Sequence, residues 1–230
     1  MNSILEEIFI TGQVQSAQGE LLQVHSHIPR EAGELLQDIL AELKPKVTLE
    51  VGLAYGISAL FICEELIKTP GSRHIIIDPY QTSAWKDIGL HNLKKAGYQK
   101  IIDFYNKPSH IIIPNLEDRG IKIDFAFIDG MHTFDHVLVD FFCIDKLLRV
   151  GGVIVFDDTH IPSLKKVCRF VALNRSYSVF KCLTTQKEFQ RSMPKFVKLG
   201  LAAGRIPTLR CIAFKKDLED RRDWNFHSDF

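Results

Sequence analysis

The stretch LEVGLAYGIS, which runs from Leu49 to Ser58, decides the fold of this chain. An apolar run ends at Glu50, and glycines follow at positions 52 and 56. The pattern is typical of a buried strand that turns directly into a helix, since Gly52 permits a tight turn and Gly56 permits close packing where the helix starts. Ser58 falls near the N-terminus of that helix, where free N–H groups and the helix dipole favour an anion.

This stretch differs from two common phosphate-binding motifs. A dinucleotide-binding loop would read G-x-G-x-x-G, and a P-loop would need Gly-Lys followed by Ser or Thr. Neither is present here. The carboxylate of Glu50 would repel a pyrophosphate but suits an ammonium group, while the helix N-terminus suits a carboxylate. A nucleoside that carries an amino acid offers both an ammonium for Glu50 and a carboxylate for the helix N-terminus. An NAD-dependent dehydrogenase is therefore the least favoured class of enzyme.

Short apolar runs recur along the chain, and helical patterns separate most of them. The runs lie at 47–51, 74–77, 101–105, 123–128 and 153–156. Because several are apolar throughout, we expect strands covered on both faces, joined by right-handed crossovers into a doubly wound, Rossmann-like α/β sheet. The segments 176–183 and 209–214 predict a final hairpin-like pair, with a basic, irregular excursion between them.

A single domain is the expected organisation of the 230 residues. We expect residues 1–45 to form a helical extension packed on the core, residues 46–216 to form the catalytic domain, and residues 217–230 to form a charged, peripheral tail. Segments 11–30 and 185–208 are the expected walls of a substrate site. The second of these is rich in Lys and Arg, which favours a solvated surface over a lid on an anionic substrate.

Composition and charge limit which partners and which cellular location can be expected. The net charge of +1 gives no global field that would recruit nucleic acid or a membrane. Glu6 and Glu7 stand where a signal peptide would be basic and then apolar, and no apolar stretch approaches the roughly 18 residues of a membrane span. The five cysteines lack C-x-x-C spacing and favour reduced, buried thiols. The sequence therefore predicts a soluble, cytoplasmic protein.

Residues 26–160 resemble the class I S-adenosylmethionine-dependent methyltransferases, and more closely the small O-methyltransferases typified by the catechol and caffeoyl-coenzyme A enzymes. The stretches that carry the resemblance are IPREAGELLQDIL, LEVGLAYGIS, IDFAFIDGMH and LLRVGGVIVFDDTH. The resemblance implies a seven-stranded methyltransferase sheet, mostly parallel with an antiparallel last strand, and a homodimer.

The resemblance also implies how S-adenosylmethionine is held. Asp78 ends the second strand, where its carboxylate can accept hydrogen bonds from both ribose hydroxyls, and Ser109 is expected near the adenine. Asp129 is expected on the cofactor side as well as at a metal. The residues implied to hold the methionine part lie in the opening stretch: Glu50, Gly52, Ala54, Gly56 and Ser58.

Three carboxylates are expected at one edge of the sheet. Asp129 ends one strand, and Asp157 and Asp158 end the next. Without a cation they would repel one another and raise each other's pKa, and hard oxygen ligands of this kind suit Mg²⁺, Ca²⁺ or Mn²⁺. The resemblance implies a divalent ion that orients the acceptor oxygen, although the family usually has Asn where this chain has Asp158. The alternative is that Asp129 serves only the cofactor and the other two form a solvated turn.

A base is needed to take the proton of an acceptor hydroxyl. The catechol-type family carries a lysine three residues after its first metal aspartate, and His132 occupies that position here. An imidazole with an ordinary pKa near 6.5 can act as a base at neutral pH. His160, just beyond the aspartate pair, is the alternative base.

The function favoured by these observations is S-adenosylmethionine-dependent O-methylation of a small-molecule hydroxyl, assisted by a divalent metal such as Mg²⁺. Two alternatives stay open. One is a metal-independent N- or O-methyltransferase, and the other is a non-catalytic cofactor-binding protein with the same fold.

Overall fold

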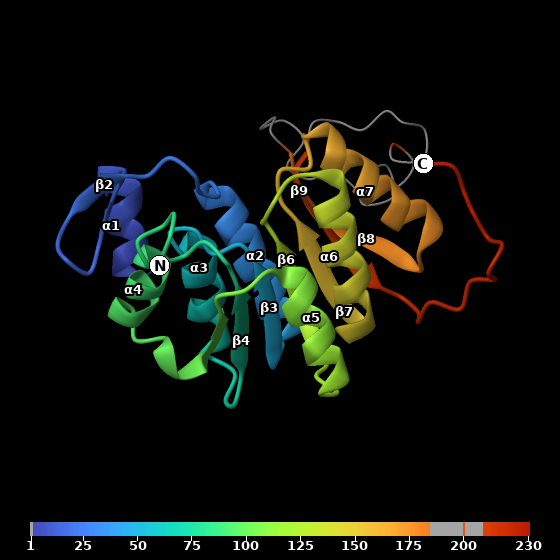
Figure 1. Ribbon diagram of the computed structural model, residues 1–230, viewed down its shortest axis with the longest axis horizontal. Helices are drawn as coiled ribbons and strands as arrows, with labels where there is room; N and C mark the ends of the chain where they lie inside the picture. Colours follow the sequence, from blue (N-terminus) through green and yellow to red (C-terminus); the bar gives the residue numbers. More distant parts are fainter. Residues whose placement is uncertain (1, 185–199, 201–208) are drawn as a thin grey trace. The chain divides into compact units, whose positions relative to one another are not determined.

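The computed structural model describes residues 2–184, 200 and 209–230. Its strands form a small hairpin and a seven-stranded mixed sheet, and helices occur between the strands (Figure 1). This confirms the expected α/β methyltransferase-like sheet. The chain forms two compact units, Met1–Asn115 and Leu116–Phe230. The basic excursion at 185–208 lies outside the described residues, apart from residue 200, and no described helix is long and apolar enough to cross a membrane.

The first unit opens with helices and a hairpin and continues as alternating strands and helices. The hairpin was not predicted, because strands of three residues are too short to show an alternating pattern. The elements are α1 (Ser3–Thr11), β1 (Gln13–Gln15), β2 (Leu21–Gln23), α2 (Arg30–Leu43), β3 (Val47–Val51), α3 (Ile57–Leu66), β4 (Arg73–Ile77), α4 (Ile88–Lys95), the short 3-10 helix η1 (Gln99–Ile101), β5 (Ile102–Tyr105) and α5 (Ser109–Asp118).

Strands β5, β4 and β3 of the first unit are parallel and adjacent in that order, which aligns their carboxyl ends. Val51 pairs with Ile77, and Ile77 pairs with Tyr105. Just beyond these pairs, the N–H of Gly52 donates to the carbonyl of Ile77 at 2.9 Å, and that of Asp78 donates to the carbonyl of Tyr105 at 3.2 Å. Gly52 and Asp78 therefore stand side by side at one edge of the sheet.

Helices α2 and α3 pack against each other through a glycine. A Cβ added at Gly33 would lie 2.2 Å from the ring of Phe61, which is itself fully buried. Helix α3 buries nearly all of its residues, as its apolar sequence ISALFICEEL leads one to expect. The absence of a side chain at position 33 therefore sets how closely α2 approaches the helix that follows the glycine-rich turn.

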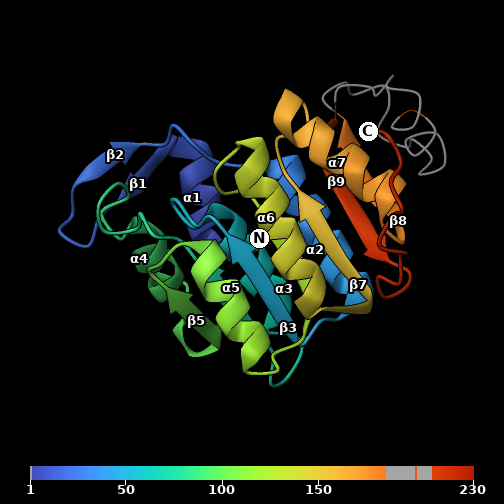
Figure 2. The ribbon, with the colours of Figure 1, turned by 45° about the vertical axis from the view of Figure 1, so that its right-hand side comes forward.

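The second unit contains the remaining strands and two long helices. Its elements are β6 (Ile123–Ile128), α6 (Phe134–Leu147), β7 (Leu148–Phe156), α7 (Pro162–Asn174), β8 (Tyr177–Thr184) and β9 (Leu209–Lys216). β6 and β7 are parallel, and β9 lies antiparallel to both β7 and β8. The expected final pair of strands is confirmed, and Figure 2 shows α6 and α7 side by side within this unit.

One boundary differs from the expectation that the fifth parallel strand covers only 153–156. β7 begins at Leu148 and includes Gly151 and Gly152. Its pairing with β6 shifts register between Ile123 and Phe125, so these glycines belong to an irregular part of the strand and do not precede it. A Cβ at Gly152 would lie 2.9 Å from the carbonyl oxygen of Asp124, which explains why a glycine is needed there.

A buried lysine of β9, the last strand, donates hydrogen bonds to the end of α6. The Nζ of Lys216, 1% exposed, donates to the carbonyls of Asp145 and Leu148 at 2.7 and 2.9 Å, where α6 ends and β7 begins. The carboxylate of Asp145 accepts hydrogen bonds from Arg175 and from the hydroxyl of Tyr177. The ammonium thus satisfies carbonyls that the end of a helix leaves without intrahelical donors.

Replacing Gly33 with Ala should destabilise the protein by about 1–3 kcal/mol, because the buried ring of Phe61 has no space to yield to the new methyl group. This cost outweighs the gain of about 1 kcal/mol in helix propensity. Urea denaturation would measure it, with the exposed neighbour Glu34→Ala as the control. An unchanged or raised midpoint for Gly33→Ala would contradict the packing described here.

Replacing Lys216 with Met should cost about 3 kcal/mol, because it leaves the carboxylate of Asp145 and two carbonyls short of a buried donor. The matched control is Lys215→Met, one residue earlier on the half-buried face of β9, which should cost less than about 1 kcal/mol. Denaturation midpoints of the two variants give the comparison, and equal losses would refute the special role of Lys216.

Candidate active site

The turn after β3 takes up an unusual backbone conformation. Gly52, Ala54 and Gly56 all have positive φ angles, of 92°, 47° and 79°. A Cβ at Gly56 would lie 2.9 Å from the carbonyl oxygen of Gly89 in α4, and one at Gly89 would lie 2.6 Å from that of Ala54. Both glycines are therefore required by close backbone contact, as expected for Gly56 from the sequence.

The carboxylate of Asp78 fills this turn. Its Oδ2 accepts hydrogen bonds from the N–H groups of Leu53 and Ala54, both at 3.0 Å, and from Nε2 of Gln81 at 2.9 Å. Its Oδ1 accepts from the N–H of Tyr80 at 2.8 Å. The backbone donors that could cradle a phosphate are thus already held by a carboxylate of the chain itself, which is a physical reason against a pyrophosphate here. Oδ1, with a single donor, retains capacity to accept from a hydroxyl.

Glu50 is completely buried and lies in a chain of hydrogen bonds. The hydroxyl of Ser58 donates to its Oε1, and Nε2 of His74 lies 3.0 Å from its Oε2. On the other side of the imidazole, the hydroxyl of Thr48 lies 2.8 Å from Nδ1. Thr48 on one side and Glu50 on the other fix the orientation of the His74 ring, and the ring in turn holds the carboxylate of Glu50 in place.

His74 was not singled out from the sequence. The signal for it exists, because Thr48 and Glu50 share one face of a strand and Thr48 pairs with His74 across the parallel ladder. Recognising that signal requires the register of β3 against β4, which a single sequence does not reveal.

Ser109, expected near the adenine, lies in the first unit, as do three aromatic rings beside the glycine-rich turn. Ser109 is the first residue of α5, directly after β5 and half-buried. Trp85, in the segment before α4, stacks on His25 with ring centroids 5.6 Å apart, and both contact the ring of Tyr55. The structure therefore joins the glycine-rich turn to the segment before α2 through three aromatic rings.

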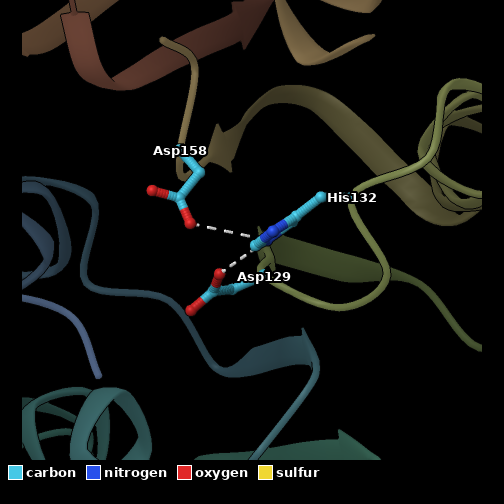
Figure 3. A group of neighbouring side chains, drawn as sticks. All are labelled: Asp129, His132 and Asp158. Atoms are coloured by element: carbon cyan, nitrogen blue, oxygen red, sulfur yellow. Dashed lines mark hydrogen bonds and ion pairs between the residues drawn. The ribbon is translucent and has the colours of Figure 1, made fainter. Parts of the chain in front are cut away.

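A second set of site residues gathers in the second unit, at the ends of β6 and β7. Nε2 of His132 lies 3.3 Å from Oδ1 of Asp129 and 3.6 Å from Oδ2 of Asp158, so the imidazole sits between two carboxylates (Figure 3). The hydroxyl of Ser163 donates to the backbone carbonyl of His132 at 2.6 Å and fixes this loop. Asp158 has a φ of 49°, an uncommon conformation for a non-glycine residue.

The carboxylate and the imidazole alter each other's proton affinity. Burial raises the pKa of Asp129 to about 7, with smaller contributions from the neighbouring aspartates, while the hydrogen bond to His132 opposes the rise. That same hydrogen bond raises the pKa of His132 above its ordinary 6.5. Near neutral pH the two groups therefore compete for a proton.

Asp157 lies apart from this pair of carboxylates. It is fully buried, and its two oxygens accept hydrogen bonds from Nε and Nη2 of Arg210 at 3.1 and 2.6 Å. The thiol of Cys211 also contacts its Oδ1, at 2.8 Å. Within the described residues, the group whose ligand atoms all lie within 4.8 Å of one another consists of Asp129, His132 and Asp158. The expectation of three carboxylates is thus met only in part, because Asp157 is paired with an arginine that the sequence did not single out.

His160 is placed less favourably than His132 as a base. Its Nδ1 lies 3.6 Å from Oδ1 of Asp158, and its side chain is 40% exposed. His160 thus contacts the carboxylate of Asp158, whereas His132 faces the carboxylates of both Asp129 and Asp158. The geometry therefore favours His132 as the group that exchanges a proton at this edge.

The donor set at this edge is chemically suited to a divalent cation. Two carboxylates and one imidazole offer two hard oxygens and a nitrogen, a combination that suits Mn²⁺ and, with added water ligands, Mg²⁺. Asp129 and Asp158 would supply the charge, and the ion would have to displace any proton held by Asp129 or His132.

Comparison with known proteins gives a consistent family. A family model described as a methyltransferase domain matches residues 49–159. The chain is 33% identical over 135 residues to a caffeoyl-CoA O-methyltransferase of Stellaria longipes, which covers 56% of this chain and 52% of that protein. It is 28% identical over 176 residues to catechol O-methyltransferase B of Danio rerio, covering 74% and 64%. The chain spans about half the length of the first of these curated relatives.

The fold is also that of solved methyltransferases. An O-methyltransferase from Bacillus cereus, solved in complex with SAH, aligns with 94% of this chain and 92% of its own, with a TM-score of 0.63 and 19% identity. That likeness concerns the fold. In sequence, the chain is similar to the S-adenosylmethionine-dependent methyltransferases of the catechol and caffeoyl-coenzyme A O-methyltransferase type.

Proposed function

We propose that this protein methylates a hydroxyl group of a small molecule, with S-adenosylmethionine as the methyl donor and a divalent cation as an aid. The observation that carries the proposal is the grouping of Asp129, His132 and Asp158 at the ends of two neighbouring strands. The match to a methyltransferase domain supports the methyl donor, and the similar proteins, which are O-methyltransferases, support oxygen as the methyl acceptor. A cytoplasmic location and a homodimer stay predictions.

The first unit supplies the groups for the donor, which when bound presents an electrophilic methyl group on a sulfonium. The helix N-terminus at Ser58 suits the carboxylate of the methionine part, and the buried Glu50, held by Ser58 and His74, supplies a negative charge that suits its ammonium without direct contact. Oδ1 of Asp78 accepts from a ribose hydroxyl. Gly52, Ala54 and Gly56 give the loop its shape, and Ser109 serves the adenine side.

The second unit supplies the groups for the acceptor. A divalent cation held by Asp129 and Asp158 would lower the pKa of an acceptor hydroxyl. His132 takes the hydroxyl proton at Nε2, and Asp129 steadies the resulting imidazolium. His160 is the alternative base, on the exposed side of Asp158.

One observation favours a second candidate, a metal-independent methyltransferase. Nη1 of Arg210 lies 2.6 Å from Oδ1 of Asp158, in addition to its two bonds to Asp157, so one positive charge already offsets these two carboxylates. Turnover that persists in the presence of a strong chelator would favour this candidate over metal assistance.

Calorimetric titration with S-adenosylhomocysteine tests the cofactor assignment. The wild-type protein should bind the nucleoside, and Asp78→Asn should weaken binding at least about tenfold, because it removes the charge that organises the turn and accepts from the ribose. The control is Asp103→Asn in β5, a half-exposed surface ion pair with Arg73, which should bind as the wild type does. Absence of binding by the wild type would refute the proposed function.

Turnover measurements test the base. With catechol and caffeoyl-coenzyme A offered as acceptors, His132→Gln should lower kcat by about 10²–10⁴-fold while retaining S-adenosylhomocysteine binding. His136→Gln is the matched control, since that exposed histidine contacts Thr133 at the start of α6 and should turn over normally. Wild-type kcat in His132→Gln would exclude His132 as the base. Failure of the wild type to methylate either compound would count against an acceptor of this kind.

A further inference from the structure

Arg210 reaches the two consecutive aspartates from the start of β9, and all three guanidinium nitrogens are engaged. Nε and Nη2 bind the two oxygens of Asp157 at 3.1 and 2.6 Å, and Nη1 binds Oδ1 of Asp158 at 2.6 Å. The side chain of Arg210 is 23% exposed. This forked pairing is the strongest geometry that an arginine and a carboxylate can adopt.

The two aspartates differ in what remains for another ligand. Asp157 is fully buried, and with Cys211 against Oδ1 its two oxygens already have three donors. Asp158 is 16% exposed and uses Oδ1 for Arg210, while its Oδ2 faces His132. The positive φ of Asp158 turns the chain here, so that neighbouring residues send their carboxylates in different directions.

The backbone holds Arg210 firmly in this position. The N–H of Thr159 donates to the carbonyl of Arg210 at 3.0 Å, and its hydroxyl donates to the carbonyl of Leu209 at 2.9 Å. On the opposite side, the N–H of Asp157 donates to the carbonyl of Ile128 at 3.2 Å. The loop that carries both aspartates is therefore fastened to β6 and to β9, which limits how far Arg210 and Asp157 can separate.

We propose that Arg210 is a positioning residue that keeps Asp157 away from the cation, so that the carboxylate ligands of the cation are Asp129 and Asp158, beside the Nε2 of His132 that takes the hydroxyl proton. Binding a cation through Asp157 would require breaking its charge-assisted bonds to Arg210 inside the protein, whereas Oδ2 of Asp158 is available without that cost. The inference rests on the divalent cation of the proposed function, and it replaces the set of three carboxylates expected from the sequence.

Calorimetric titration of the intact protein with Mn²⁺ tests this with two isosteric variants of adjacent residues. Asp158→Asn should weaken Mn²⁺ binding at least about tenfold, and Asp157→Asn should change it by less than about threefold. Thermal unfolding of each variant shows whether it is folded. Equal, large losses in both variants would overturn the proposal, because Asp157 would then be a ligand.

Removing the arginine gives the converse result. Arg210→Gln should strengthen Mn²⁺ binding by about tenfold or more, because it releases Asp157 and removes a nearby positive charge. In the double variant Arg210→Gln/Asp157→Asn, the part of the gain that comes from Asp157 should disappear. This double variant leaves no buried charge without its counter-charge, so it remains informative where the single variant fails to fold. If Arg210→Gln and the double variant gain Mn²⁺ affinity equally, Asp157 contributes nothing to the gain, and the proposal that Arg210 keeps Asp157 from the cation is overturned.

S-adenosylhomocysteine titrations on the same samples separate this inference from the proposed function. Nucleoside binding that fails in the wild type counts against the methyltransferase proposal, whatever Mn²⁺ does. Nucleoside binding that is retained, with no Mn²⁺ binding in the wild type and none gained in Arg210→Gln, overturns the role of Arg210 and the cation assistance, and leaves the assignment of the methyl donor standing.

Discussion

A carboxylate removed from water must have hydrogen-bond donors or a counter-charge, and this requirement organises the site residues of each unit. Three buried carboxylates at the strand ends are satisfied by the chain itself, in three different ways. Asp78 accepts backbone N–H groups of the turn after β3, Glu50 accepts from Ser58 and His74, and Asp157 is held by Arg210. The two aspartates that keep some exposure, at 129 and 158, are those that flank the imidazole of His132.

The buried and the partly exposed carboxylates therefore have different roles. These buried carboxylates hold the fold in shape, because exchanging the donors that they already have would be costly. Oδ1 of Asp78, which has a single donor, can in addition accept from a ligand. Partly exposed carboxylates can exchange protons, water or ions at lower cost, and they are the groups assigned to the acceptor. The same residue type thus serves two purposes at the strand ends, and burial decides which one.

The sequence predicted the parts of this arrangement that depend on neighbouring residues. The strand-turn-helix at Leu49–Ser58, the acid at the end of β4 and the acidic ends of β6 and β7 all follow from local patterns. The pairing of Asp157 with Arg210 does not, because it depends on the register of an antiparallel strand that returns about 50 residues later. Phe156 pairs with Ile212, which brings Cys211 and Arg210 opposite the two aspartates. His74 escaped notice for a similar reason, since its contact with Glu50 depends on the register of two parallel strands.

The backbone contact between Gly56 and Gly89 has a consequence for how this protein can vary. A side chain at either position would collide with the main chain of the other segment, and main chain cannot move aside as a side chain can. The two positions are therefore constrained jointly, although they are far apart in the sequence. Any lineage that placed a larger residue at one of them would first have to move the start of α4 away from the turn. The same backbone contact therefore limits which residues can be accepted at position 56 and at position 89.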